Sequence, residues 1–213
     1  MNSKVILVIL DGWGLPKAGE EWRSAIEAAH VPYFRELMAT YPSSTLEACG
    51  RAVGLPNGQM GNSEVGHTNL GAGRVVYQEL EKINVAIEEG HLAKEAVLTD
   101  AFAYAKTNGK NVHFIGLVSD GGVHSHIDHL KGLLHIAAEA SVENVFVHAF
   151  MDGRDCDPKS GKGFIQDIEP VLSETGAKLA SLTGRYFAMD RDKRWDRVKL
   201  AYDAMVKGEG EQR

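Results

Sequence analysis

The chain has 213 residues, 44% of them hydrophobic and 24% charged, which is the composition of a folded protein with one or two domains. Its formal net charge of −6 argues against the basic surface that a nucleic-acid-binding domain needs. Its two cysteines argue against a disulfide framework, and no apolar run is long enough to span a membrane. We therefore expect a cytoplasmic protein without a nucleic-acid or membrane partner.

The first predicted element is a strand over residues 5–10, a continuous aliphatic run that ends at Asp11 and Gly12. Such a run is typical of a strand buried on both faces of a parallel sheet. A helix is predicted over residues 32–40, because a proline suits its first turn and a second proline follows its end. The glycine-rich residues 50–73 favour a structured loop with a helical turn inside it.

From residue 76 onwards helices and strands alternate, starting with a helix over 76–89. This order predicts an α/β fold with a parallel sheet and right-handed crossovers. A ligand is expected beyond the carboxyl ends of the strands. Helices are predicted over 93–106, 127–140, 163–175 and 195–206, and strands over 111–118, 145–150 and 178–182.

Two residues near the N-terminus have both a functional and a structural interpretation. Asp11 is either a turn residue or a hard oxygen ligand for a divalent cation. Ser63 lies before a predicted short helix, where free N–H groups favour a phosphate. Its hydroxyl is a weak nucleophile unless a base or a metal activates it. Alternatively, Asn62 or Ser63 is only the helix N-cap, with Glu64 in the first turn.

The segment HSHIDH contains His124, His126 and His129 and is similar to the dinuclear zinc signature of metallo-β-lactamase-like hydrolases. That fold needs further histidines downstream, and after position 129 only His135 and His148 follow, on a predicted helix and a predicted strand. The pattern therefore favours His126 and His129 as first-turn helix residues. His124 stays a candidate for phosphate binding or proton transfer.

Arginines follow glycine at two predicted strand ends. Arg154 and Arg185 stand where a guanidinium group can bind a carboxylate or a phosphate through two hydrogen bonds. Asp155 is a candidate acid or base. Arg191 is a third candidate anion contact, whereas Arg197 on the last predicted helix is expected to be an ordinary surface residue.

Taken together, these motifs resemble the cofactor-independent (2,3-bisphosphoglycerate-independent) phosphoglycerate mutases, a branch of the alkaline phosphatase superfamily. The similarity covers nearly the whole chain, in family order. The matching segments are LDGWG at 10–14, AVGLPNGQMGNSEVGHTNLGAGR at 52–74, LVSDGGVHSHIDHL at 117–130, FMDGRDCDP at 150–158 and LTGRYFAMDRDKRWDR at 182–197.

This resemblance implies a glycolytic isomerase, an intramolecular phosphotransferase that interconverts 3-phosphoglycerate and 2-phosphoglycerate through a phosphoserine. It implies two divalent metal ions, usually manganese in bacteria, and a monomeric intact parent enzyme. Ser63 is implied to be the phosphorylated residue, and Asp11 and Ser63 to be ligands of one metal. The implied substrate contacts are His124, Arg154, Asp155, Arg185 and Arg191, with Asp155 also catalytic.

The resemblance also implies a division into domains. Residues 1–75 would be the first piece of an alkaline-phosphatase-like metal-binding domain, and residues 76–213 most of an inserted α/β transferase (substrate-binding) domain. The C-terminal phosphatase part, with most metal ligands, would be missing. The strand over 5–10 would then lack partners and expose an apolar edge, and the chain alone would have little mutase activity. The segment at 22–25 departs from the family's Gly-Asn-Ala.

Two other functions are compatible with the sequence. In the first, the chain is a non-catalytic phosphoglycerate-binding module or one subunit of a split enzyme. In the second it is a zinc hydrolase that uses the three histidines of the HSHIDH segment.

Overall fold

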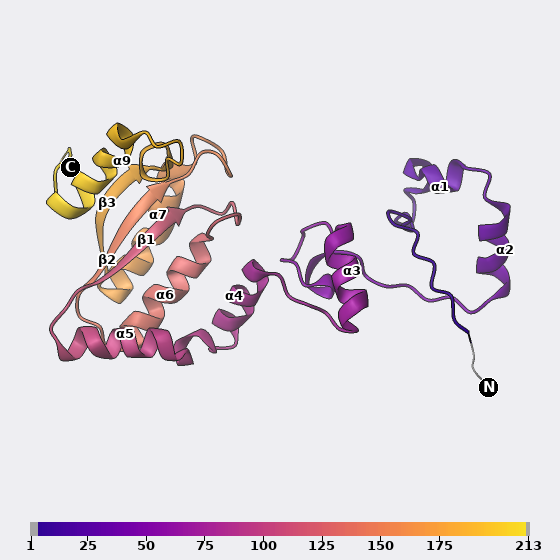
Figure 1. Cartoon of the computed structure of the whole chain (residues 1–213), viewed down its shortest axis with the longest axis horizontal. Helices are drawn as coiled ribbons and strands as arrows, with labels where there is room; N and C mark the ends of the chain where they lie inside the picture. The colour runs from indigo at the N-terminus through magenta and orange to yellow at the C-terminus, as the bar shows by residue number, and fades with distance from the viewer. Residues whose placement is uncertain (1–3, 212–213) are drawn as a thin grey trace. The chain divides into compact units, whose positions relative to one another are not determined.

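The computed structural model describes residues 4–211, and the chain forms two compact units with their boundary between Gln78 and Glu79 (Figure 1). The assignment of these units to a phosphatase piece and a transferase domain stays a prediction. Among residues 4–211, no helix combines the length and the apolar character that a membrane crossing requires.

The first unit consists of short helices joined by irregular segments. The helix predicted over residues 32–40 is present with those bounds as α2, and the short helix predicted at Ser63 in the glycine-rich segment is present as α3. The elements are a 3-10 turn at Glu21–Arg23, α1 at Ala25–Ala28, α2 at Pro32–Thr40, a 3-10 turn at Gly50–Val53 and α3 at Ser63–Ala72.

The strand predicted over residues 5–10 is not formed. A strand exists only when a neighbour completes its ladder of hydrogen bonds, and the first unit's described residues form one isolated bridge, between Cys49 and Met60. The aliphatic side chains of residues 5–10 are accordingly 45% to 87% exposed. The local pattern was that of a buried strand, but the partners that would bury it are absent from the described residues.

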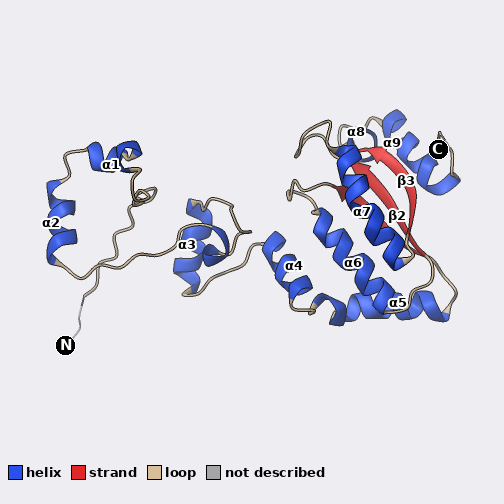
Figure 2. Cartoon of the chain, turned by 180° about the vertical axis from the view of Figure 1, so that it is seen from behind, coloured by secondary structure: helices blue, strands red, loops and turns tan. Residues whose placement is uncertain are grey.

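The second unit follows the predicted alternation of helices and strands (Figure 2). Sequence reasoning missed the short helix that directly follows the last strand. The elements are α4 at Glu79–Glu88, a 3-10 turn at Leu92–Lys94, α5 at Ala96–Thr107, β1 at Val112–Val118, α6 at Ile127–Glu139, β2 at Val145–Met151, α7 at Gly161–Thr175, β3 at Lys178–Gly184, α8 at Arg185–Ala188, α9 at Trp195–Tyr202 and a π-helical turn at Asp203–Lys207.

The three strands form one parallel sheet in the order β1-β2-β3, which confirms the predicted α/β class. Helices α6 and α7 pack on one face of this sheet (Figure 2). Val147 of β2, Leu134 of α6 and Ile168 of α7 are each at most 1% exposed in that layer. Because all strands run the same way, their carboxyl ends meet at a single edge of the sheet, and the loops that follow them lie together.

A row of polar side chains crosses the sheet. His113 Nδ1 of β1 lies 2.9 Å from His148 Nε2 of β2, and His148 Nδ1 lies 2.8 Å from Ser181 Oγ of β3. Since successive side chains of a strand alternate between faces, His148 lies on the face opposite to Val147. Burial, followed by the neighbouring His113, lowers the pKa of His148.

Candidate anion-binding site

A cavity of about 480 Å³ lies at the carboxyl ends of β2 and β3. Its walls carry both charged and apolar side chains. They come from the loops after β1 and β2, from α8, from the turn between α8 and α9, and from α9. It is lined by His124, Asp152, Gly153, Arg154, Gly184, Arg185, Tyr186, Met189, Asp190, Arg191, Asp192 and Arg197.

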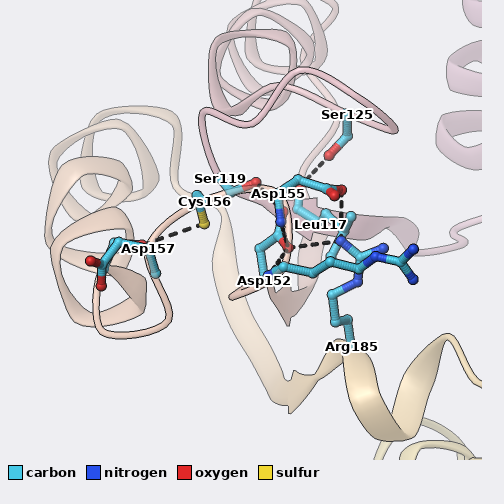
Figure 3. Close-up of polar contacts among 10 residues, drawn as sticks. Leu117, Ser119, Ser125, Asp152, Asp155, Cys156, Asp157 and Arg185 are labelled. Carbon is cyan, nitrogen blue, oxygen red and sulfur yellow. Dashed lines mark hydrogen bonds and ion pairs between the residues drawn. The ribbon is translucent and has the colours of Figure 1, made fainter.

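Arg185 is held between two carboxylates at the base of this site. Its Nη1 donates to Asp152 Oδ1 at 2.8 Å and to Asp155 Oδ2 at 2.7 Å (Figure 3). The Arg185 side chain is 12% exposed, and these two hydrogen bonds, the one to Asp155 first, raise its pKa. Arg185 is thus a fixed cation whose charge is already compensated.

Asp152 was not among the residues singled out from the sequence, yet it is the most connected group of the site. Its side chain is 1% exposed and accepts hydrogen bonds from Arg185, from the Ser119 hydroxyl at 2.7 Å, and from the backbone N–H groups of Arg154 and Asp155. Burial alone would raise the pKa of Asp152, but the donors, led by Arg185, lower it well below its usual value. The only sequence signal was its place as the first carboxylate after a buried strand.

The loops after β1 and β2 are in direct contact. Ser119, 1% exposed, joins them through its hydrogen bond to Asp152. A Cβ atom on Gly121 would lie 2.9 Å from both the carbonyl oxygen and the Cβ atom of Asp155. Glycine at position 121 therefore permits an approach that no other residue allows. The loop after β1 is fixed further by the Ser125 hydroxyl, which donates to the Leu117 carbonyl at 2.7 Å.

The other predicted anion contacts are open to a ligand. Arg154, Arg191 and His124 line the cavity, and all three are exposed. Within residues 4–211, neither Arg154 nor Arg191 forms an ion pair through its side chain. Asp155 does not line the cavity but lies beside it, bonded to Arg185. The structure thus brings together all five residues proposed as substrate contacts.

Arg197 is not the ordinary surface residue that the sequence predicted. Its side chain is 20% exposed and lines the cavity. Its guanidinium group lies 3.8 Å from the centroid of the Tyr186 ring, and its Nη1 is 3.4 Å from Asp190 Oδ1. The periodicity of the sequence places Arg197 on a helix, but it does not reveal that the side chain contacts an aromatic ring and a carboxylate of other elements.

The charges of the cavity are nearly balanced. Its lining contains four arginines and three aspartates. Two arginines, Arg185 and Arg197, are paired with carboxylates, which leaves Arg154 and Arg191 as the uncompensated cations. A small ligand with anionic groups can therefore bind two free guanidinium groups beside a fixed third one.

Ser63 begins helix α3, as predicted, and the adjacent Asn62 is the N-cap, accepting the Val65 N–H at 3.0 Å. Ser63 Oγ lies 3.2 Å from His67 Nδ1, and the same ring nitrogen lies 2.8 Å from the Ser63 carbonyl oxygen. A carbonyl oxygen only accepts, so in this arrangement Nδ1 carries the proton and Ser63 Oγ accepts too. His67 is therefore not placed to take the hydroxyl proton of Ser63.

Asp11 lies in a turn that the Trp13 N–H closes on the Leu10 carbonyl at 3.2 Å, and its side chain is exposed. Within the described part of the chain no hydrogen bond joins it to Ser63. Nor do residues 4–211 contain any group of three or more His, Cys, Asp or Glu side chains that could hold a metal ion. The described residues alone therefore do not fit the implied two-metal site.

Two of the three HSHIDH histidines have structural roles in the described residues. His126 is the N-cap of α6, and its Nδ1 accepts the Asp128 N–H at 3.2 Å. His129, in the first turn, places Nε2 2.7 Å from Asn84 Oδ1, which ties α6 to α4. His124 alone of the three lines the cavity. This arrangement agrees with the prediction that His126 and His129 are residues of the helix start.

The fold and the site define an α/β protein with an arginine-lined cavity at the strand ends. The family described as BPG-independent PGAM N-terminus (iPGM_N) matches residues 83–213. The chain belongs to this family, the cofactor-independent phosphoglycerate mutases that the sequence motifs resemble.

Among its relatives are the 2,3-bisphosphoglycerate-independent phosphoglycerate mutases of Flavobacterium johnsoniae and Bacteroides fragilis. They are 60% and 59% identical over 210 residues, which is 99% of this chain but 41% of each relative. The chain thus spans about two fifths of the length of these proteins. A crystal structure of the Leishmania mexicana phosphoglycerate mutase at low cobalt concentration is similar with a TM-score of 0.62 and 36% identity, covering 88% of this chain and 36% of that one.

Proposed function

We propose that the chain is the N-terminal part of a cofactor-independent phosphoglycerate mutase and that its second unit binds the phosphoglycerate. The observation that carries this proposal is the arrangement of Arg154 and Arg191, exposed and uncompensated, beside the fixed Arg185 in one cavity. The substrate's carboxylate and phosphate are the anionic groups that planar guanidinium donors bind best.

In the proposed reaction Ser63 carries the phosphoryl group between the two hydroxyls of glycerate. The bond from phosphorus to the 3-oxygen of the substrate breaks while the bond to Ser63 Oγ forms. The Ser63 proton passes to water, and the departing 3-oxygen takes up a proton to become the 3-hydroxyl of glycerate. The glycerate then re-orients, its 2-oxygen attacks the phosphorus, and Ser63 Oγ departs and regains a proton. Asp155 is proposed to move the proton at the glycerate hydroxyls, since Oδ1 accepts no hydrogen bond within residues 4–211.

The metal dependence implied by the family remains part of the proposal. Asp11 and Ser63 are proposed as two ligands of one divalent cation, manganese by family resemblance, and further ligands would have to come from outside the described residues. A bound cation would neutralise phosphoryl charge and stabilise the deprotonated serine oxygen. The intact parent is proposed to be a cytoplasmic monomer.

Calorimetric titration of the purified chain with 3-phosphoglycerate, with and without manganese, tests the binding part. We expect binding that Arg154→Ala and Arg191→Ala each weaken and that Lys110→Ala, a change at an exposed lysine before β1, leaves unchanged. Lack of binding by the wild-type chain would contradict the proposal. For the catalytic part, we expect the chain alone to convert little 3-phosphoglycerate, and rapid turnover would show this expectation to be wrong.

The cavity is formed entirely within the second unit, which gives a reason to keep a second candidate function. A non-catalytic phosphoglycerate-binding module, or one subunit of a split enzyme, needs only this unit. Tight binding that is independent of manganese, together with no phosphate on Ser63 in mass spectra after incubation with substrate, favours the module.

A further inference from the structure

A second buried carboxylate organises the turn between α8 and α9. The Asp190 side chain is 2% exposed, and its Oδ2 accepts the backbone N–H groups of Asp192 at 3.2 Å and of Arg194 at 2.9 Å. Its Oδ1 faces Arg197 on α9. The turn over residues 190–194 is therefore closed around one carboxylate, and that carboxylate is linked to the following helix.

Arg197 joins this turn to the preceding helix as well. Its guanidinium group lies over the face of the Tyr186 ring of α8, at the short distance given above. Arginine suits such a site because its planar group stacks on an aromatic ring while its edge still donates to a carboxylate. One side chain of α9 thus contacts both α8 and the turn that connects the two helices.

From this geometry we infer that Arg197 and Asp190 are positioning residues that hold Arg191 at the cavity. Arg191 lies in the turn that Asp190 closes, and it is one of the two uncompensated arginines of the site. The ligand class it is held for is a small anion with a carboxylate or phosphate group. That ligand assignment rests on the proposed function, whereas the restraint of residues 190–194 by Asp190 and Arg197 does not depend on it.

The charges distinguish positioning from direct contact. Asp190 compensates the charge of Arg197, and Tyr186 covers one face of its guanidinium group. Arg191 is exposed and has neither kind of partner in the described part of the chain. Arg197 therefore acts through the turn, and Arg191 contacts the anion.

Amide hydrogen exchange measured by NMR on the whole chain tests the hold without any ligand. In Arg197→Gln we expect the amides of Asp192 and Arg194 to exchange about tenfold faster than in the wild type, as for the loss of one charged hydrogen-bond partner. Amides of β2 should not change. Lys199→Gln, which removes a charge from the same helix, is the control. It should change the exchange rates of neither the turn amides nor the β2 amides. Arg197→Lys keeps a cation near Asp190 but not the flat stacking, and should give intermediate exchange.

Titration with 3-phosphoglycerate then tests the consequence. Arg197→Gln should bind about tenfold more weakly, and Arg191→Ala should weaken binding without faster exchange in the turn. Unchanged exchange in Arg197→Gln refutes the inference, and weaker binding with unchanged exchange assigns Arg197 to direct contact instead. Faster exchange with unchanged affinity also refutes it. If the wild-type chain binds no 3-phosphoglycerate, the proposed function fails, while the exchange rates still decide whether the turn is held.

Discussion

Replacement of Asp152 by asparagine is the most informative change to the site, because it alters the charge and almost nothing else. The amide oxygen can still accept from Arg185 and from the two backbone N–H groups, and the Ser119 hydroxyl can turn to accept from the new amide nitrogen. What disappears is the negative charge opposite a guanidinium group, in a side chain that is 1% exposed.

The expected cost follows from the difference between charged and neutral hydrogen bonds. Since charged bonds contribute about twice as much as neutral ones, we expect Asp152→Asn to lower the free energy of unfolding of the second unit by about 1–3 kcal/mol at pH 7. Asp152→Ala should cost more, about 3–5 kcal/mol, because it leaves buried donors and Arg185 without this acceptor. Asp167→Asn is the control: its carboxylate is 52% exposed and paired with Lys131, so its loss should cost at most about 1 kcal/mol.

The pH dependence gives a second, independent test. The pKa of Asp152 is lowered in the folded state, so the unfolded chain binds more protons once the pH falls below the ordinary aspartate value of about 4. The stabilisation by Asp152 is therefore fully present above about pH 4 and is lost as the pH falls toward its folded pKa. Urea unfolding followed by the NMR signals of the sheet amides should show the difference between wild type and Asp152→Asn shrinking below pH 4. A difference that is absent at pH 7, or equal at pH 7 and pH 3, would refute this reasoning.

Four further predictions follow from individual contacts. Gly121→Ala should destabilise the second unit by about 1–3 kcal/mol, by overpacking against the neighbouring loop, whereas Gly163→Ala, with open space around it in α7, should be neutral or stabilising in the same urea assay. His148 has a lowered pKa, so the wild type should lose stability as the pH falls below about 6.5, and His148→Gln should flatten that part of the curve. The exposed aliphatic residues 5–10 favour association between chains. Ile6→Lys, at a residue that is 87% exposed, should therefore reduce light scattering while it leaves the unfolding free energy unchanged within about 0.5 kcal/mol. Arg154→Ala should weaken 3-phosphoglycerate binding about tenfold or more in calorimetry, with an unchanged circular dichroism spectrum.

The second unit was predicted well because its signals are local. The strands β1 and β2 are short runs rich in apolar residues, whereas β3 alternates apolar and polar ones, and a helix of suitable length stands between each pair. The parallel order and the position of the site at the strand ends then follow from general rules of connection. Arg154 and Arg185 could be chosen because each directly follows a glycine at such an end. The helix α8 was missed because its four residues are too few to show a period.

The errors concern properties that depend on distant residues. The run at residues 5–10 has the composition of a buried strand, but pairing partners decide whether a strand forms, and the described residues supply none. Asp152 and Asp190 were not selected as site residues, because only the fold shows that each is nearly fully buried under several donors. Arg197 was misjudged for the same reason, since its two partners lie on other elements.

The prior fixation of Arg185 affects the entropy of ligand binding. A free arginine side chain samples many rotamers, and immobilising one at an interface costs about 0.5–1.5 kcal/mol. The hydrogen bonds to Asp152 and Asp155 already immobilise Arg185 in the folded chain. A ligand that binds Arg185 therefore does not lose this side-chain entropy on binding. Arg154 and Arg191 keep their freedom until the ligand arrives. The site thus combines an arginine that is fixed before binding with two adaptable ones, and this combination would suit the proposed re-orientation of a bound glycerate.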